Sequence, residues 1–62
     1  MRLDEITKKL NENHRLIEEQ MNAGYAVVET SEEEAKAYIR SVSKLLLENI
    51  ELILERHKLN QH

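Results

Sequence analysis

The chain has one glycine, Gly24, and no proline among its 62 residues. Because glycine and proline are the strongest helix breakers, the backbone has a single evident breaking point. On each side of it the apolar residues recur every three or four positions, which is the spacing of an amphipathic helix. We therefore predict an all-α, antiparallel two-helix hairpin, with one helix over about residues 3–22 and a second over about 31–59.

The first predicted helix carries one apolar stripe, formed by Leu3, Ile6, Leu10, Ile17 and Met21. Asn13 interrupts the stripe, and two interpretations stay open: a core amide that fixes register or oligomeric state, or a solvated residue at the rim. Gln20 is expected at the surface. Gly24 is expected just after the helix, in the left-handed conformation that closes helix C-termini.

The residues of the connector and of the start of the second helix also predict local structure. Residues 25–29, Tyr-Ala-Val-Val-Glu, have β propensity, which favours an extended connector whose Tyr25, Val27 or Val28 covers the end of the core. An edge strand that pairs with a partner is the alternative. Ser31 is expected to cap the amide of Glu34 as in a capping box, and residues 60–62 are expected to form a frayed tail.

The lengths of the two predicted helices indicate a partner. At about 1.5 Å per residue they span about 28 and 43 Å, so the first covers the second only to about residue 50. The uncovered end carries Leu52, Ile53, Leu54 and Leu59. A chain this short needs support from disulfides, metal or oligomerisation, and it contains no cysteine.

A second copy packed through the second helix would supply that support as a four-helix bundle. An antiparallel pair would let each overhang cover the other, although the sequence does not decide between parallel and antiparallel. We expect the self-association surface to comprise Ile39, Val42, Leu46, Ile50, Ile53 and Leu54.

No combination of residues predicts catalysis, a cofactor or a metal. Ser31, Ser41 and Ser43 have no histidine at short spacing, and His57 and His62 lie near the C-terminus. His14 and Glu18 share a helix face, but they would supply two metal ligands rather than four. We therefore expect a non-enzymatic protein.

Charge and hydropathy restrict the class further. Lys36, Arg40 and Lys44 form a basic ridge, which the i+4 pairs Glu32–Lys36 and Lys44–Glu48 explain as a solvated face. A nucleic-acid-associated regulator that uses this ridge is an alternative, which the net charge of −3 disfavours. No apolar run approaches the roughly 20 residues of a membrane span, and no signal peptide is evident, so we expect a soluble cytoplasmic or nuclear protein.

One segment, Leu10-Asn11-Glu12-Asn13-His14-Arg15-Leu16-Ile17, resembles the opening of the N-terminal domain of the SSXT transcriptional coactivator family. Glu34, Tyr38, Val42 and Leu46 fall where that family has its second helix. The resemblance covers about 40 residues and implies a helical hairpin that binds transcription factors and chromatin-remodelling subunits. It further implies that Leu16, Ile17, Tyr38 and Leu46 line the contact face.

Both lines of reasoning predict the same class of protein. We expect residues 1–62 to form a single-domain homodimer that binds a further protein partner of unknown identity. Tyr25, Val27 and Val28 are the expected contacts for that partner.

Overall fold

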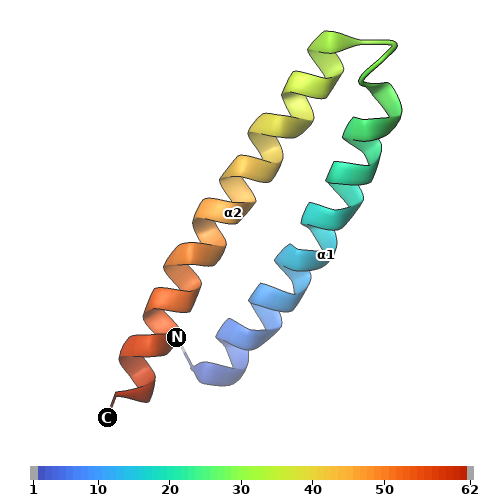
Figure 1. Ribbon diagram of the computed structural model, residues 1–62. Helices are drawn as coiled ribbons and strands as arrows, with labels where there is room; N and C mark the ends of the chain where they lie inside the picture. Colours follow the sequence, from blue (N-terminus) through green and yellow to red (C-terminus); the bar gives the residue numbers. More distant parts are fainter. Residues whose placement is uncertain (1, 62) are drawn as a thin grey trace.

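The computed structural model describes residues 2–61 and contains two α-helices joined by a short connector (Figure 1). Helix α1 runs over Leu3–Val27 and α2 over Glu32–Asn60. The helices lie antiparallel and in contact, with both chain ends at one end of the molecule and the connector at the other. The predicted all-α hairpin is thereby confirmed; His62, which was expected in a frayed tail, lies outside the described residues.

The end of α1 differs from its prediction. The helix continues past Gly24 to Val27, and no described residue has a positive φ. Residues 25–27 are therefore helical, and only residues 28–31 connect the two helices. The prediction was wrong because it treated Gly24 as a backbone requirement, whereas the structure needs it for close packing: an added Cβ would lie 3.3 Å from Cβ of Tyr38.

The backbone at the connector is satisfied at both sides. The carbonyl of Val27 accepts hydrogen bonds from the amides of Thr30 at 3.1 Å and Ser31 at 2.8 Å, and from the Thr30 hydroxyl at 3.3 Å. These donors compensate for the missing next turn of α1. The Ser31 hydroxyl accepts from the Glu34 amide at 3.2 Å, so the predicted N-cap of α2 is confirmed.

The longer α1 corrects the predicted overhang. Leu52 was expected to be uncovered, but it is only 6% exposed and packs in one cluster with Ile6 and Leu10. Coverage therefore extends past residue 50, because a four-residue connector lets α1 lie beside more of α2. Ile53, Leu54 and Leu59 remain exposed, and the last turn of α2 extends beyond the start of α1 (Figure 1).

The hairpin is long and thin. Its principal extents are 50 × 14 × 12 Å and its radius of gyration is 14.4 Å, whereas a compact domain of this length would have about 11 Å. Its accessible surface is 5055 Å², against about 4,200 Å² for a typical folded monomer of this mass. One layer of two helices thus leaves a large surface uncovered.

Candidate protein-binding face

The seam between the helices follows an alternating three- and four-residue spacing. Every described residue at these positions is buried or half-buried. They are Ile6, Leu10, Asn13, Ile17, Gln20, Gly24 and Val27 in α1, and Ala35, Tyr38, Val42, Leu45, Asn49, Leu52 and Arg56 in α2. This is the coiled-coil repeat, and it places Gln20 at the seam rather than at the predicted surface, with its Oε1 buried and without a hydrogen-bond partner.

A polar network crosses the middle of the seam. Nδ2 of Asn13 donates to Oδ1 of Asn49 at 2.9 Å and to Oε1 of Glu48 at 3.0 Å. Nζ of Lys9 lies 3.7 Å from the same Glu48 oxygen. Asn13 is 4% exposed and Asn49 5%, so of the two interpretations left open for Asn13 the structure supports the buried one.

Asn49 was not predicted as a residue of the seam, although the spacing of the seam residues identifies its position. It stands seven residues after Val42 and seven before Arg56, in the series that faces α1. Glu48 was predicted to pair with Lys44 on α2, but the structure turns its carboxylate toward α1. The predicted Glu32–Lys36 pair is confirmed, at 3.4 Å.

The two margins of the seam differ. On one margin Leu16, Ala23, Ser41 and Glu48 are half-buried. On the other margin His14 and Glu18 of α1 are polar, whereas seven flanking residues are large, apolar and exposed. These are Met21, Tyr25 and Val28 of α1 and Ile39, Leu46, Ile50 and Ile53 of α2, which together we call the open face. The hairpin is therefore closed on one side and apolar on the other.

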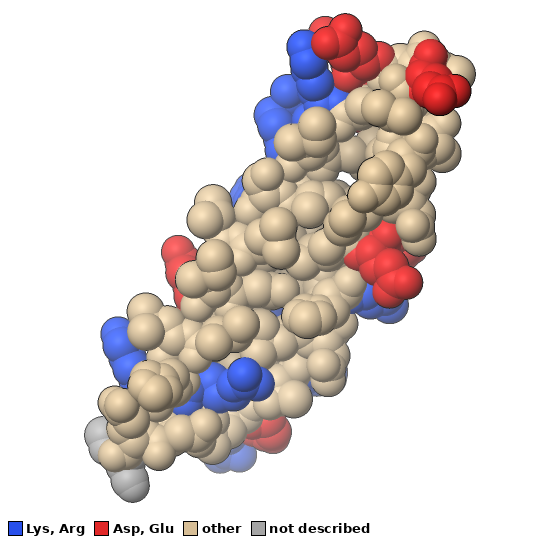
Figure 2. Space-filling model, viewed as in Figure 1, with Lys and Arg blue, Asp and Glu red and all other residues tan. Residues whose placement is uncertain are grey.

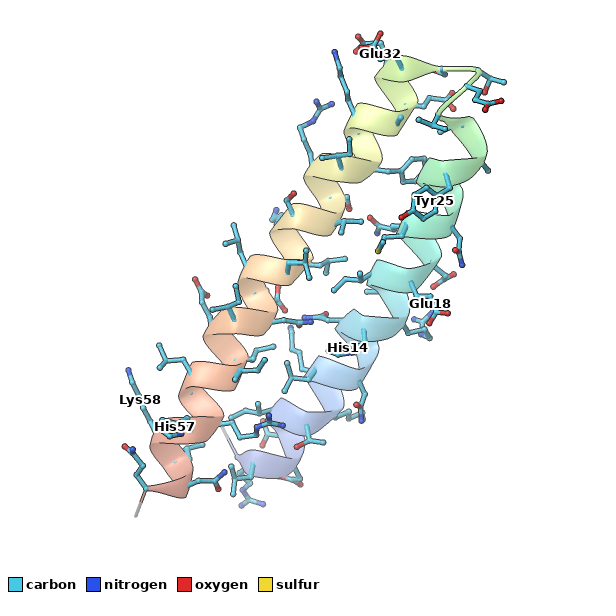
Figure 3. The ribbon with its side chains drawn as sticks, viewed as in Figure 1. His14, Glu18, Tyr25, Glu32, His57 and Lys58 are labelled. Atoms are coloured by element: carbon cyan, nitrogen blue, oxygen red, sulfur yellow. The ribbon has the colours of Figure 1, made fainter. Side chains whose placement is uncertain are left out.

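Figure 2 shows the molecule from the side on which Tyr25 lies in Figure 3, where uncharged atoms run along much of the length and most charged side chains lie at the margins. Tyr25 is 69% exposed and Ile39 63%. Leu47 and Leu54 extend the apolar surface toward the outer edge of α2, and both are exposed. An exposed apolar surface of this extent is typical of an interaction site.

Two hollows lie along the open face. The larger has a volume of about 340 Å³ and lies near the connector, lined by Met21, Gly24, Tyr25, Tyr38, Ile39 and Val42 among others. The smaller, of about 280 Å³, is lined by His14, Glu18 and Asn49 among others, and it shares Met21, Tyr25 and Leu46 with the first. Two small residues, Gly24 and Ala35, are part of the lining of the larger hollow.

The structure distributes the predicted contact residues over both sides of the seam. Of the expected self-association residues, Val42 is half-buried at the seam, and the others are exposed: Ile39, Leu46, Ile50, Ile53 and Leu54. Of the expected partner contacts, Tyr25 and Val28 are exposed, whereas Leu16, Ile17, Val27 and Tyr38 are half-buried. The sequence analysis placed Met21 in the core, but the structure exposes it on the open face.

The residues considered for chemistry lie apart from one another. His14 and Glu18 are both exposed on α1 (Figure 3), and His57 is near the far end of α2, where Nε2 of Gln61 lies 3.0 Å from its Nε2. Within residues 2–61, no three histidine, aspartate or glutamate side chains are grouped closely enough to hold a metal ion. No helix in that range is long and apolar enough to cross a membrane.

Comparison with known proteins adds no family: no family model, curated protein or solved structure matches the chain. The resemblance to the SSXT domain therefore stays a prediction.

Proposed function

We propose that this chain is a small protein-binding module that dimerises through α2 into a four-helix bundle and, as a dimer, binds a further protein. The observation that carries the proposal is the continuous open face on a hairpin with a very small core. Among residues 2–61, the buried apolar residues are Ile6, Leu10, Ala35 and Leu52. Burying a large aliphatic side chain contributes about 1.5–3 kcal/mol, so covering the open face would add substantially to the apolar burial of the hairpin.

The size of the open face fits this role. From the exposed fractions of its seven side chains we estimate about 700 Å² of accessible area, close to the roughly 800 Å² that each partner buries in a standard protein interface. The surface required is therefore already present without a change in the fold. Tyr25 and Val28 lie near the connector, where a bundle would present them close to its ends for a further partner.

The basic ridge supports the nucleic-acid alternative less well. Lys36 is engaged by Glu32 at 3.4 Å, and Arg40 and Lys44 belong to a chain of net charge −3. A regulatory or transcriptional role, as the SSXT resemblance implies, would use the same open face. We therefore place the function in protein binding, without a catalytic step.

Sedimentation equilibrium across a concentration series tests the proposal. We expect a species of twice the 7.3 kDa chain mass at micromolar concentration. Leu46→Asp should reduce the mass to one chain and lower the helicity, because an aspartate in the open face would place a charge in the interface. Lys44→Asp, an exposed residue of the same helix outside the open face, is the control and should stay dimeric. A fully helical monomer of the unaltered chain would refute self-association.

A further inference from the structure

We infer that the occupant of the open face is a second copy whose α2 runs antiparallel to the first, in one register centred between Leu45 and Leu46. This inference rests on the proposed self-association and adds the orientation, the register and the residues that select them. Its basis is the distribution of charge along the outer edge of α2, together with the position of the hollow near the connector.

Four exposed charged residues of that edge form two pairs of equal spacing: Glu33, Arg40, Glu51 and Lys58. Glu33 and Glu51 are 18 residues apart, as are Arg40 and Lys58, and 18 residues make about five complete helical turns. Each pair therefore lies on one line along the helix, and the two lines are neighbours. From the connector outward, these four charges alternate as negative, positive, negative, positive. Lys44 lies between Arg40 and Glu51 on the same edge, and the proposed register sets it opposite an uncharged residue, Leu47 of the partner subunit.

Reversing one copy of α2 makes this pattern complementary. Glu33 then lies opposite Lys58 of the partner subunit, and Arg40 opposite the partner's Glu51. Both pairs have the same midpoint, between Leu45 and Leu46, and a two-fold axis there repeats each pair. In a parallel pair of α2 helices this edge would face the opposite flank of the partner's helix, so neither of these charge pairs would form. Charged pairs at the rim of a helical interface mainly determine the relative orientation and register of the two helices.

The apolar residues agree with this register. Leu46 and Leu47 lie beside the midpoint, so each meets the partner's copy of itself near the axis. Both are exposed in the hairpin, and Leu47 lies toward the outer edge, where only a neighbouring α2 would cover it. In α1 the residues His14 and Glu18 make the corresponding surface polar away from the connector, which also directs the seam to α2.

The hollow near the connector has a defined occupant in the same arrangement. The register brings Ile53 of the partner subunit to the level of Tyr38 and Ile39, two residues that line the 340 Å³ hollow. The lining is almost entirely apolar, so an aliphatic side chain can fill it as a knob fills a hole in a helical bundle. By symmetry each hairpin supplies one such side chain and one such hollow.

Charge reversal tests the register. Arg40→Glu and Glu51→Arg should each weaken dimerisation by about tenfold in Kd, because each single change turns two attractive pairs per dimer into two repulsive ones. The double variant should return to within about threefold of the unaltered chain, because both pairs are restored with the signs exchanged. Helicity is monitored in parallel; Arg40→Glu places a carboxylate four residues from both Lys36 and Lys44, which favours the helix.

Lys8→Glu is the matched control, since it changes the net charge as much as Arg40→Glu does but lies exposed on α1, away from the edge. It should leave Kd within about twofold. Equal effects of Lys8→Glu and Arg40→Glu, or a double variant as weak as the singles, would overturn the register.

A distance measurement tests the orientation. The chain has no cysteine, so Lys58→Cys accepts a single spin label. In the antiparallel dimer the two labels are separated along the bundle by 25 residues of helix, about 38 Å, whereas in a parallel dimer they lie side by side. A dimeric mass with the long distance supports the inference, and a dimeric mass with a short distance contradicts it while leaving self-association intact. A monomeric mass without a dipolar signal removes both.

Discussion

Gly24 lies in the middle of a helical turn, where glycine costs about 1 kcal/mol relative to alanine. Its place is explained by packing, because a Cβ there would lie 3.3 Å from Cβ of Tyr38. Ala35, also small, is buried near the same end. The two residues let the helices approach closely beside the connector.

We predict that Gly24→Val lowers the free energy of unfolding by about 1–3 kcal/mol, the usual cost of overpacking a close contact. Ala26→Val is the control, since Ala26 is exposed on the same helix and a valine there costs only about 0.5 kcal/mol of helix propensity. Thermal unfolding followed by circular dichroism measures both variants. Equal losses would show that the contact with Tyr38 does not limit the packing.

Asn13 and Asn49 carry the polar centre of the seam. Their amides are joined at 2.9 Å, and Glu48 accepts a further hydrogen bond from Asn13 at 3.0 Å. A buried group that loses its partner costs about 1–3 kcal/mol, whereas replacing both partners with apolar groups can be neutral or favourable. The network is therefore better suited to fixing alignment than to adding stability.

We predict that Asn13→Leu and Asn49→Leu each lower stability by about 1–2 kcal/mol, because each removes the hydrogen bond between two buried amides and leaves the remaining amide under-satisfied. Asn13→Leu deprives Asn49 of its donor, whereas Asn49→Leu leaves Asn13 with Glu48 alone. The double variant should be at least as stable as the unaltered chain, so the effects will be non-additive. Urea unfolding of all four proteins gives the cycle. Additive losses would show that the two amides do not act as a pair.

For the two helices, the positions at which α1 ends and α2 begins determine how much of α2 is covered by α1. The carbonyl of Val27 receives three donors from the connector, and Ser31 begins α2 immediately afterwards. A turn this short keeps the helices level along nearly their whole length. Leu52 is covered for this reason, while the last turn of α2, with Leu59, is left exposed.

We predict that Ser31→Ala lowers stability by about 1 kcal/mol, because the Glu34 amide loses the Ser31 hydroxyl that accepts from it at 3.2 Å. Ser43→Ala, at an exposed position inside α2, should change stability by no more than a few tenths of a kcal/mol, and in the stabilising direction. Chemical denaturation measures the difference. A loss at Ser43 as large as that at Ser31 would contradict the capping role.

For the complete hairpin, the accessible surface is large relative to its small buried core. The chain has a radius of gyration of 14.4 Å and an accessible surface of 5055 Å². Folded domains retain only about 5–15 kcal/mol of net stability, and among residues 2–61 four apolar residues are buried, so burial of the open face would be a large addition. In the proposed dimer two layers of helices pack together, one from each hairpin, and the length stays close to that of one hairpin.

We predict that thermal stability depends on chain concentration. A hundredfold rise in concentration should raise Tm by on the order of 10 °C, because association that stabilises only the folded chain adds free energy with the logarithm of concentration. Leu46→Asp should have a lower Tm that does not change with concentration. A constant Tm for the unaltered chain would mean that the hairpin folds alone.

Local patterns in the sequence are enough to predict the two helices and their antiparallel packing. Two apolar repeats, one possible break and a Ser31 cap lead to one antiparallel hairpin, because helix formation and capping depend on neighbouring residues. The same local reasoning misplaced the end of α1, since it could not know that Tyr38 would lie against Gly24. The prediction also exchanged Gln20 and Met21, because it continued the apolar stripe from Ile17 to Met21. In the structure the seam continues from Ile17 to Gln20, one residue earlier, and Met21 is exposed.

Which apolar residues stay exposed depends on how the two helices pack against each other. Leu52 and Ile53 are neighbours of similar hydropathy, yet one is buried against Ile6 and Leu10 and the other is exposed. The difference comes from the rotation and register of two helices relative to each other, and these depend on side chains more than 30 residues apart, such as Asn13 and Asn49. The open face is therefore a property of the packed pair, which neither helix specifies alone.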